Sequence, residues 1–327
     1  MIGVVGAGAW GTALAQMLAS DGREVLLWAL EDGLADAINT TRSNGLYLPS
    51  ADLAPSIRAT GDIFDMAECE ILLMVTPAQH LGNVLSMMRA YPRDLVLCSK
   101  GIEQSTGRMM NDVAREIAPG AQIAVLSGPT FAHEVAAGLP AAVTLACGGG
   151  DAQWERLSPE IARPHFRPYY SDDVIGAETG GAVKNVLAIA CGVVDGLGLG
   201  QNARNALITR GFAEMLRFGV ALGGKPETLN GLCGLGDLVL TCSSTSSRNF
   251  SLGKALGEGM SAAEALADRR TVAEGAHTAP VLRELAIRHG LSMPITEAVN
   301  ALLEGQPAPD VVRELLARPL KAEGHEG

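Results

Sequence analysis

The sequence predicts an α/β protein in which a mainly parallel, doubly wound sheet is followed by an all-α C-terminal domain. Up to residue 170, short apolar runs typical of strands alternate with helical patterns, and this alternation indicates a parallel sheet covered by helices. Beyond residue 176 the strand signal disappears and only helical patterns remain. A chain of 327 residues suits two domains, which we place at residues 1–176 and 177–327.

The elements can be assigned in order along the chain. The predicted strands are residues 2–5, 24–28, 57–60, 71–75, 95–99, 123–127, 141–146 and 166–170. Helices are predicted at residues 12–20, 31–39, 79–90, 106–117 and 130–137, with a connector at 171–176. The second domain is predicted to open with an apolar helix after residue 178, followed by helices at 202–222, 248–257, 262–267, 276–290, 295–303 and 310–317. Residues 322–327 are expected to fray.

A glycine-rich motif, Gly6-Ala7-Gly8-Ala9-Trp10-Gly11, lies where the first strand gives way to the first helix. In this context the first glycine makes the turn, the second lets a pyrophosphate approach the backbone, and the third lets the helix pack on the strand. The N–H groups at the helix start can then bind the phosphates. The alternative is a glycine-rich turn without a ligand. The surrounding strand–helix alternation favours a dinucleotide site on a Rossmann-like sheet.

Composition excludes several functional classes. With 47% hydrophobic and 19% charged residues the chain is globular, and its net charge of −11 offers no general attraction for nucleic acid or anionic membranes. No run of 18 apolar residues predicts a membrane span, and the N-terminus lacks the basic region of a signal peptide. The six cysteines show no C-x-x-C spacing and the histidines no H-E-x-x-H motif. We therefore expect reduced core cysteines, no metal site and a cytoplasmic protein.

Two lysines are informative because the chain has only five lysines against twenty arginines. Lys184 interrupts a helix that is apolar on every side, and Lys100 directly follows a predicted strand. A buried ammonium needs a partner or loses its proton, and lysine, unlike arginine, can be tuned to exchange a proton near neutral pH. Gly180 and Gly181 suggest that a polar ligand approaches the same helix. The alternative for Lys184 is a side chain that extends to solvent near a helix end.

Two further polar spots lie in the second domain. Asp237 follows the apolar, glycine-rich segment G-L-C-G-L-G and is the natural partner for Lys184, since each would otherwise be a buried unpaired charge. The segment Ser247-Arg248-Asn249, at a predicted helix start, combines the hydroxyl, guanidinium and amide groups that suit a phosphate. An ordinary serine N-cap beside a solvated arginine is an equally weighted alternative.

Taken together, the motifs resemble those of the bacterial NAD(P)-dependent glycerol-3-phosphate dehydrogenases over nearly the whole chain. The stretches GAGAWGTALA, NTTRSNGLYLP, SKGIE, SGPTFA, GAVKNVLAIACGVVDGLGLGQN, GLGDLVLTCSS, SRN and VAEG occur in the family's order. The resemblance implies a cytoplasmic oxidoreductase that interconverts dihydroxyacetone phosphate and sn-glycerol 3-phosphate with NAD or NADP, chiefly to supply phospholipid synthesis. The expected assembly is a homo-oligomer, a dimer, although no sequence feature specifies it.

The resemblance also implies roles residue by residue. Lys184 looks like the catalytic acid/base and Asp237 like the residue that holds and orients it, with Asn185 beside them. The implied substrate contacts are Lys100, Gly128, Thr130, Lys184, Asp237, Ser247, Arg248 and Asn249. The implied cofactor contacts are Gly6, Gly8, Trp10, Gly11, Lys100, Ala132, Arg248, Val272 and Glu274.

The chain departs from the family pattern where the second strand ends. The family commonly has an arginine there that meets the 2′-phosphate of NADP, whereas this chain reads Trp28-Ala29-Leu30-Glu31-Asp32. An acidic residue at this point accepts a hydrogen bond from the free 2′-hydroxyl of NAD and repels the phosphate of NADP. We therefore expect NADH to be used at least as well as NADPH. Arg42, the next basic residue, would have to fold back to serve NADP.

Two other functions fit part of the sequence. A related Rossmann-plus-helical dehydrogenase for hydroxy acids would aim its arginine at a carboxylate instead of a phosphate. A non-catalytic NAD(P)-binding sensor would keep the glycine motif but would have no use for a buried lysine–aspartate pair. The presence of both features favours catalysis.

Overall fold

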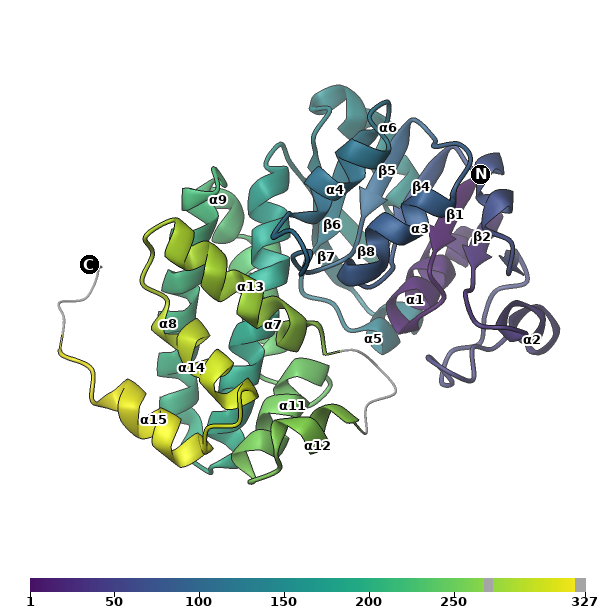
Figure 1. The fold of residues 1–327 in the computed structure, drawn as a ribbon. Coiled ribbons are helices and arrows are strands. Elements are labelled where there is room, and N and C mark those ends of the chain that lie inside the picture. Colours follow the sequence, from purple (N-terminus) through teal and green to yellow (C-terminus); the bar gives the residue numbers. More distant parts are fainter. Residues whose placement is uncertain (268–272, 321–327) are drawn as a thin grey trace. The chain divides into compact units, whose positions relative to one another are not determined.

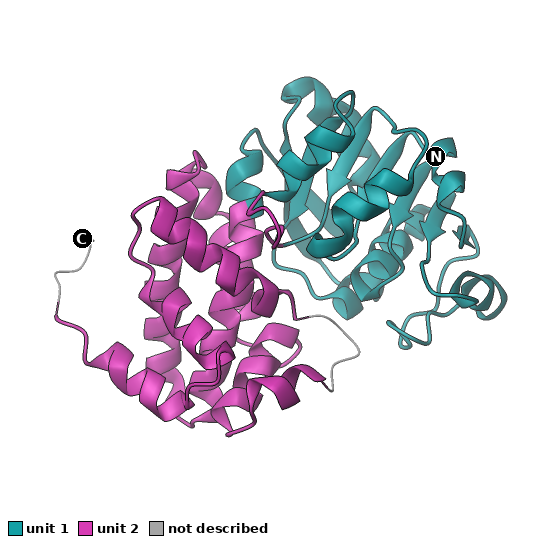
Figure 2. Ribbon diagram, in the orientation of Figure 1, with its two compact units in different colours: residues 1–100, 109–178 teal, residues 101–108, 179–327 magenta. Residues whose placement is uncertain are grey.

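The computed structural model describes residues 1–267 and 273–320, and the chain divides into two compact units (Figures 1 and 2). Unit 1 comprises residues 1–100 and 109–178, and unit 2 comprises residues 101–108 and 179–327. The division falls close to the boundary placed after residue 176 from the sequence, but residues 101–108 cluster with unit 2. The fraying expected for residues 322–327 lies outside the described residues.

Unit 1 is built on a sheet with the strand order β3-β2-β1-β4-β5-β6-β7-β8. All neighbouring strands pair in parallel except β6 and β7, so the mainly parallel, doubly wound sheet predicted from the sequence is confirmed. Val5 pairs with Trp28 on one side and with Met74 on the other, which places the carboxyl ends of β1, β2 and β4 level with one another. The strands are β1 (Ile2–Val5), β2 (Val25–Trp28), β3 (Ile57–Thr60), β4 (Ile71–Met74), β5 (Asp94–Leu97), β6 (Gln122–Ser127), β7 (Ala141–Cys147) and β8 (Phe166–Ser171).

Helices bury both faces of this sheet. Ile2 and Val4 of β1 join a core with α1, α2 and α6, while Val5, which points to the opposite face, is equally buried. Burial on both faces explains the continuous apolar runs that mark the strands in the sequence. Helix α1 packs against α5, and α3 packs against α4. The helices of unit 1 are α1 (Ala9–Leu18), α2 (Leu34–Thr41), α3 (Leu81–Met87), α4 (Met110–Ile117), α5 (Ala132–Ala136) and α6 (Asp151–Ile161).

Most helix starts differ from the sequence prediction by one to four residues, and two of the differences have a clear physical reason. Helix α2 begins at Leu34 and not at residue 31, because Gly33 adopts a left-handed conformation (φ 75°) that closes a turn before the helix. Helix α7 (Val174–Gly196) begins inside the segment predicted as a connector. Its first turn is capped by Asp173, whose Oδ1 accepts the Gly176 N–H at 2.8 Å. Helix α6 escapes sequence prediction, since Pro159 and several polar residues obscure its periodicity.

The described residues of unit 2 are helical wherever they form regular structure, as predicted. All six cysteines of the chain are free and buried, which matches the expectation of reduced core residues. After α7, the unit contains α8 (Gly200–Ala221), α9 (Pro226–Leu229), a π-helical turn (Leu232–Gly236), α10 (Asp237–Thr241), α11 (Arg248–Gly257), α12 (Ala262–Ala267), α13 (Glu274–Arg288), α14 (Pro294–Leu303) and α15 (Ala308–Leu316).

Helix α7 is a core helix that other backbones approach closely. It is long and apolar enough to cross a membrane, yet 94% of its most apolar window is buried inside the protein. A Cβ on Gly180 would lie 2.4 Å from the Cys233 carbonyl oxygen, and one on Gly192 would lie 2.0 Å from that of Phe250. These glycines therefore admit protein backbone. From the sequence we expected a ligand to approach the helix at Gly180, but it is the Cys233 backbone that requires a glycine there.

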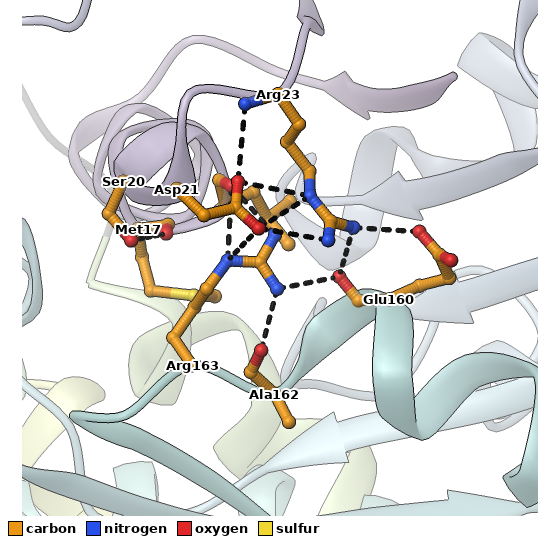
Figure 3. A network of polar contacts seen from close by, with 8 residues as sticks. Met17, Ser20, Asp21, Arg23, Glu160, Ala162 and Arg163 are labelled. Carbon is orange, nitrogen blue, oxygen red and sulfur yellow. Dashed lines mark hydrogen bonds and ion pairs between the residues drawn. The ribbon is translucent and has the colours of Figure 1, made fainter.

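A network of two arginines joins the end of α1 to the segment after α6 (Figure 3). The buried Arg163 donates to the Leu18 carbonyl from Nε at 3.2 Å and from Nη2 at 2.7 Å. Arg23 binds Asp21 and, through Nη1, the Glu160 carboxylate at 2.7 Å. The last carbonyls of a helix have no intrahelical partners, so Arg163 satisfies the end of α1. The network thereby fixes the helix whose other end carries the glycine motif.

A buried carboxylate makes the stability of unit 1 pH-dependent. Oε1 of Glu178 accepts the Asn111 N–H at 2.7 Å, while Oε2 has no hydrogen-bond partner among the described residues. Burial raises the pKa of Glu178 from 4.5 to about 8, against the opposing effect of the Asn111 hydrogen bond. A raised folded-state pKa means that the folded protein holds the proton more tightly than the unfolded chain. The stability that the protonated Glu178 carboxyl contributes is complete below pH 4.5 and is lost as the pH rises through about 8.

We therefore expect Glu178→Gln, which cannot ionise, to be more stable than the wild type at pH 8 and to lose most of that advantage near pH 5. Each pKa unit corresponds to about 1.4 kcal/mol, so the unfolding midpoint at the higher pH should rise by roughly 5 °C or more. Thermal unfolding at the two pH values measures the difference. Glu155→Gln, at an exposed glutamate of α6, is the control. The same shift at both pH values, or none at either, would contradict the assignment.

Candidate active site

The glycine motif at the end of β1 has the shape that a pyrophosphate requires. Gly6 adopts φ 115°, and a Cβ on Gly11 would lie 1.8 Å from the Gly6 carbonyl oxygen, so both positions need glycine. Apart from Gly8 and its two chain neighbours, no described residue comes within 4 Å of the Cβ position of Gly8, which leaves the loop open at its middle. Helix α1 follows directly, and no described side chain caps it at Gly8. Its first N–H groups can therefore bind phosphate oxygens.

Three buried polar atoms, one in this motif and two at the carboxyl edge of the sheet, find no hydrogen-bond partner among the described residues. They are Nε1 of Trp10, Oγ1 of Thr76 and Oγ of Ser127. Thr76 follows β4 and Ser127 ends β6, so both lie at the carboxyl edge of the sheet, where ligands of such sheets bind. Strand order reverses between β1 and β4, which is the usual position of a dinucleotide. Unpaired buried polar groups at this edge fit a ligand that supplies several polar atoms.

The other predicted residues of unit 1 follow β5 and β6 at the same edge. Lys100 is half-buried just beyond β5. A Cβ on Gly128 would lie 2.8 Å from the Val143 Cα, so packing against β7 already requires this glycine. Thr130 donates its hydroxyl to the Gly128 carbonyl at 3.3 Å, and Ala132 opens α5. Because β5 and β6 are parallel neighbours, their following loops emerge beside each other.

At the end of β2, a carboxylate lies where the adenosine ribose of a dinucleotide binds. Glu31 accepts the Tyr47 hydroxyl at 2.5 Å, and this hydrogen bond is the main reason that the pKa of Tyr47 rises to about 12. Arg42 lies at the opposite end of the sheet: its Nη1 donates to the carbonyl of Ile57, the first residue of β3, at 2.9 Å. Arg42 therefore does not fold back towards the end of β2.

In unit 2, Lys184 forms a buried ion pair. Its Nζ lies 2.5 Å from Oδ1 of Asp237 and donates at 3.0 Å to Oγ1 of Thr241. The Lys184 side chain is 8% exposed and that of Asp237 is fully buried. Lys184 lies in the middle of α7, so it does not extend to solvent near a helix end. The pairing with Asp237 that the sequence suggested is present, and removing either partner alone would leave a buried charge unpaired.

The Asn249 side chain links three helices of unit 2. Its Nδ2 donates to Oδ1 of Asn185 at 3.0 Å, next to Lys184 on α7. Its Oδ1 accepts the Gly275 N–H at 2.9 Å near the start of α13. Asn249, predicted as a substrate contact, therefore has a structural role in any case. The cluster places the first turns of α11 and α13 beside the lysine-bearing segment of α7.

The remaining predicted residues lie around these helix starts. Ser247 caps α11 by accepting the Phe250 N–H at 3.3 Å, the ordinary capping role considered from the sequence. Arg248 is exposed on the first turn of α11, and Glu274 opens α13. Val272, predicted to touch the cofactor, lies outside the described residues. Within residues 1–267 and 273–320, no three His, Cys, Asp or Glu side chains are grouped as metal ligands.

Comparison with known proteins identifies the family. The family models for the N-terminal and C-terminal parts of NAD-dependent glycerol-3-phosphate dehydrogenase match residues 1–153 and 173–314. The glycerol-3-phosphate dehydrogenase (NAD(P)+) of Erythrobacter litoralis (strain HTCC2594) is 70% identical over 99% of this chain and 98% of its own. The chain belongs to the NAD-dependent glycerol-3-phosphate dehydrogenase family.

Other members of the glycerol-3-phosphate dehydrogenase family agree over the same length. The enzyme of the same name from Novosphingobium aromaticivorans is 72% identical and covers 98% of both chains. The crystal structure of glycerol-3-phosphate dehydrogenase from Coxiella burnetii is 40% identical, with a TM-score of 0.91 over 97% of this chain and 98% of that one. The sequence-based recognition of the family is confirmed, and an NAD(P)-dependent oxidoreductase is the activity class.

Sequence reasoning missed two residues of this dehydrogenase that touch the predicted sites. Thr241 lies four positions after Asp237 on α10, so a helical i, i+4 pattern could have placed both side chains on the face towards Lys184. Tyr47 lies in the quoted NGLYLP stretch, but its contact with Glu31 depends on how the loop folds. No local pattern specifies that contact.

Proposed function

We propose that the protein is an NAD(P)-dependent sn-glycerol-3-phosphate dehydrogenase that reduces dihydroxyacetone phosphate reversibly. The buried Lys184–Asp237–Thr241 cluster carries the proposal, because apolar side chains would stabilise this core at least as well as a buried ion pair, so the pair points to a chemical role. The open glycine motif of unit 1 supports the use of a dinucleotide cofactor, and membership of the family supports the proposed activity.

The cluster suits a proton donor to the substrate carbonyl oxygen. Asp237 and Thr241 hold the Lys184 ammonium through two hydrogen bonds, which fix the position of its Nζ within α7. When bound, the reduced nicotinamide supplies the hydride that the carbonyl carbon receives. Lys184 gives a proton to the oxygen as negative charge develops there, and it takes the proton back in the reverse direction. Asp237 orients the lysine and compensates its charge.

Substrate contacts are proposed in both units. The phosphate is proposed to bind at the start of α11, where helix N–H groups, a hydroxyl and a guanidinium occur together. The carbonyl and hydroxyl groups of the substrate are then proposed to contact Lys100 and Lys184. The proposed contacts are Lys100, Gly128, Thr130, Lys184, Asp237, Ser247, Arg248 and Asn249.

We also propose that NADH is used at least as well as NADPH. The end of β2 offers the Glu31 carboxylate and no base, and Arg42 is engaged at the other end of the sheet. A 2′-phosphate carries nearly two negative charges and needs an arginine or lysine nearby. Wild-type kcat/KM several-fold higher with NADPH than with NADH would contradict this preference.

Exchanging the residues after β2 should reverse the preference. Leu30 is 67% exposed, so an arginine in its place meets no core. We expect Leu30→Arg with Glu31→Ser to shift the NADPH to NADH ratio of kcat/KM by about tenfold or more, since one charge-assisted hydrogen bond contributes ~1.5–3 kcal/mol. Met87→Arg, at an exposed position of α3, controls for the added charge. An equal shift of the NADPH to NADH ratio in Met87→Arg would show that the effect does not depend on where the arginine is added.

A cytoplasmic homodimer that supplies glycerophospholipid synthesis completes the proposal. The reaction product is the backbone of these lipids, and the net charge of −11 gives no general attraction for anionic membranes. Sedimentation equilibrium of the full chain tests the dimer. Fractionation of cells tests the localisation.

A further inference from the structure

The loop from residue 42 to residue 48 is fastened to the glycine motif. Asn44 is fully buried, and its Nδ2 donates to the Ala7 carbonyl at 2.7 Å and to Oγ1 of Thr12 at 2.8 Å. The same side chain accepts the Tyr47 N–H through Oδ1 at 3.1 Å. Ala7 lies between the first two glycines of the motif. The position of Tyr47 is therefore fixed relative to the loop that receives the pyrophosphate.

Tyr47 in turn holds Glu31. Its hydroxyl donates to Oε1 of Glu31 at 2.5 Å, a short, charge-assisted hydrogen bond. Oε2 of Glu31 makes no hydrogen bond with another described residue, so that oxygen is left for a ligand. A half-exposed glutamate without such a partner would sample several rotamers and spend much of its time in water. With the partner, its charge stays at the end of β2.

We propose that Tyr47 is a positioning residue for cofactor selectivity: it holds Glu31 where the carboxylate accepts the adenosine 2′-hydroxyl of NAD and repels the 2′-phosphate of NADP. The inference rests on the proposed preference for NADH and names the device behind it. Asn44 extends the device to the glycine motif, so that the pyrophosphate site and the ribose site share one support. The geometry assigns selectivity to a pair of residues from two separate loops.

Cofactor binding affinities test the positioning role of Tyr47 without relying on turnover. Isothermal titration gives Kd for NADH, NADPH and an NADH analogue with 2′-deoxyadenosine on the wild type, Tyr47→Phe, Glu31→Gln and the double variant. Glu31→Gln should move the NADH to NADPH affinity ratio towards NADPH by about tenfold or more, and Tyr47→Phe by about three- to tenfold, as expected for a lost charge-assisted bond and for a loosened one. The deoxy analogue should bind the wild type more weakly than NADH, and this difference should be smaller in Glu31→Gln, because a neutral amide makes a weaker hydrogen bond with the 2′-hydroxyl than a carboxylate does.

The double variant gives the sharpest outcome. If Tyr47 acts through Glu31, removing its hydroxyl from the Glu31→Gln protein should change the affinity ratio no further. Tyr91→Phe, which removes the hydroxyl that donates to the Leu85 carbonyl at 3.0 Å elsewhere in unit 1, should leave the ratio unchanged throughout. Unfolding midpoints of all variants show whether the fold is kept.

Two results separate the inference from the preference on which it rests. A wild type that binds NADPH more tightly than NADH would overturn the proposed preference and the inference with it. A wild type that prefers NADH, with a ratio that falls in Glu31→Gln but stays constant in Tyr47→Phe, would overturn the positioning role alone. A ratio that Tyr47→Phe lowers equally in the presence and absence of Glu31 would also overturn it.

Discussion

Replacing Lys184 by alanine is expected to lower kcat by about 100-fold or more, the usual size of a general acid–base contribution, while Kd for NADH stays nearly constant. Lys184→Arg should not restore activity, because a guanidinium does not release its proton. Steady-state kinetics and fluorescence titration of NADH measure the two effects separately.

The buried partner of Lys184 has to be considered in that experiment. Truncating one member of a buried ion pair costs roughly 3–5 kcal/mol of stability. The double variant Lys184→Met with Asp237→Asn removes both charges and so leaves no unpaired charge in the core. Its kcat can therefore be compared with that of the wild type without the loss of stability that a single truncation causes. Lys254→Ala is the matched control, since Lys254 pairs with Asp195 at 2.9 Å in the same unit but is partly exposed. Loss of NADH binding with kcat preserved would mean that Lys184 is structural.

Truncating Arg248 is expected to lower kcat/KM for dihydroxyacetone phosphate by about 100-fold, because a guanidinium–phosphate contact contributes ~1.5–3 kcal/mol per hydrogen bond. The effect on unphosphorylated dihydroxyacetone should be small, so the gap between the two substrates should narrow. Arg248→Lys should recover part of the loss, since it restores the charge without the planar fork. An unchanged preference for the phosphorylated substrate would rule out this phosphate site.

The structure decides which variants test the phosphate site cleanly. Ser247 caps α11 and Asn249 joins three helices, so alanine at either position also perturbs the fold. Arg248 is exposed, which makes its truncation the less disruptive choice. The family resemblance also gives Arg248 a cofactor contact, so Kd for NADH must be measured in parallel. Arg283→Ala, at a surface arginine paired with Glu304 at 2.8 Å, is the control.

Much of the fold could be predicted because its signals are local. Strands buried on both faces are continuous apolar runs, and the glycine motif lies at the junction where its context confirms it. Helix α11 (Arg248–Gly257) and β3 (Ile57–Thr60) begin and end where the sequence placed them. The pairing of Lys184 with Asp237 could be inferred because each charge lies in an apolar segment and needs a partner of opposite sign.

What the sequence left open depends on contacts between distant segments. The Tyr47–Glu31 bond and the engagement of Arg42 with Ile57 follow from how one loop lies against β2 and β3, which no local pattern encodes. The reason for Gly180 was misjudged for the same cause, since only the folded chain shows the Cys233 carbonyl beside it. The start of α7 was placed too late because Asp173, an ordinary capping residue, followed a strand-like run.

The most direct test of the central claim is a stoichiometric assay of the wild-type protein with dihydroxyacetone phosphate and NADH. We predict that each mole of NADH oxidised yields one mole of sn-glycerol 3-phosphate and none of its enantiomer. We also predict that Lys184→Ala reduces this rate by about 100-fold or more under the same conditions. Tight NADH binding without product formation, or faster turnover of a 2-oxo acid than of dihydroxyacetone phosphate, would contradict the account.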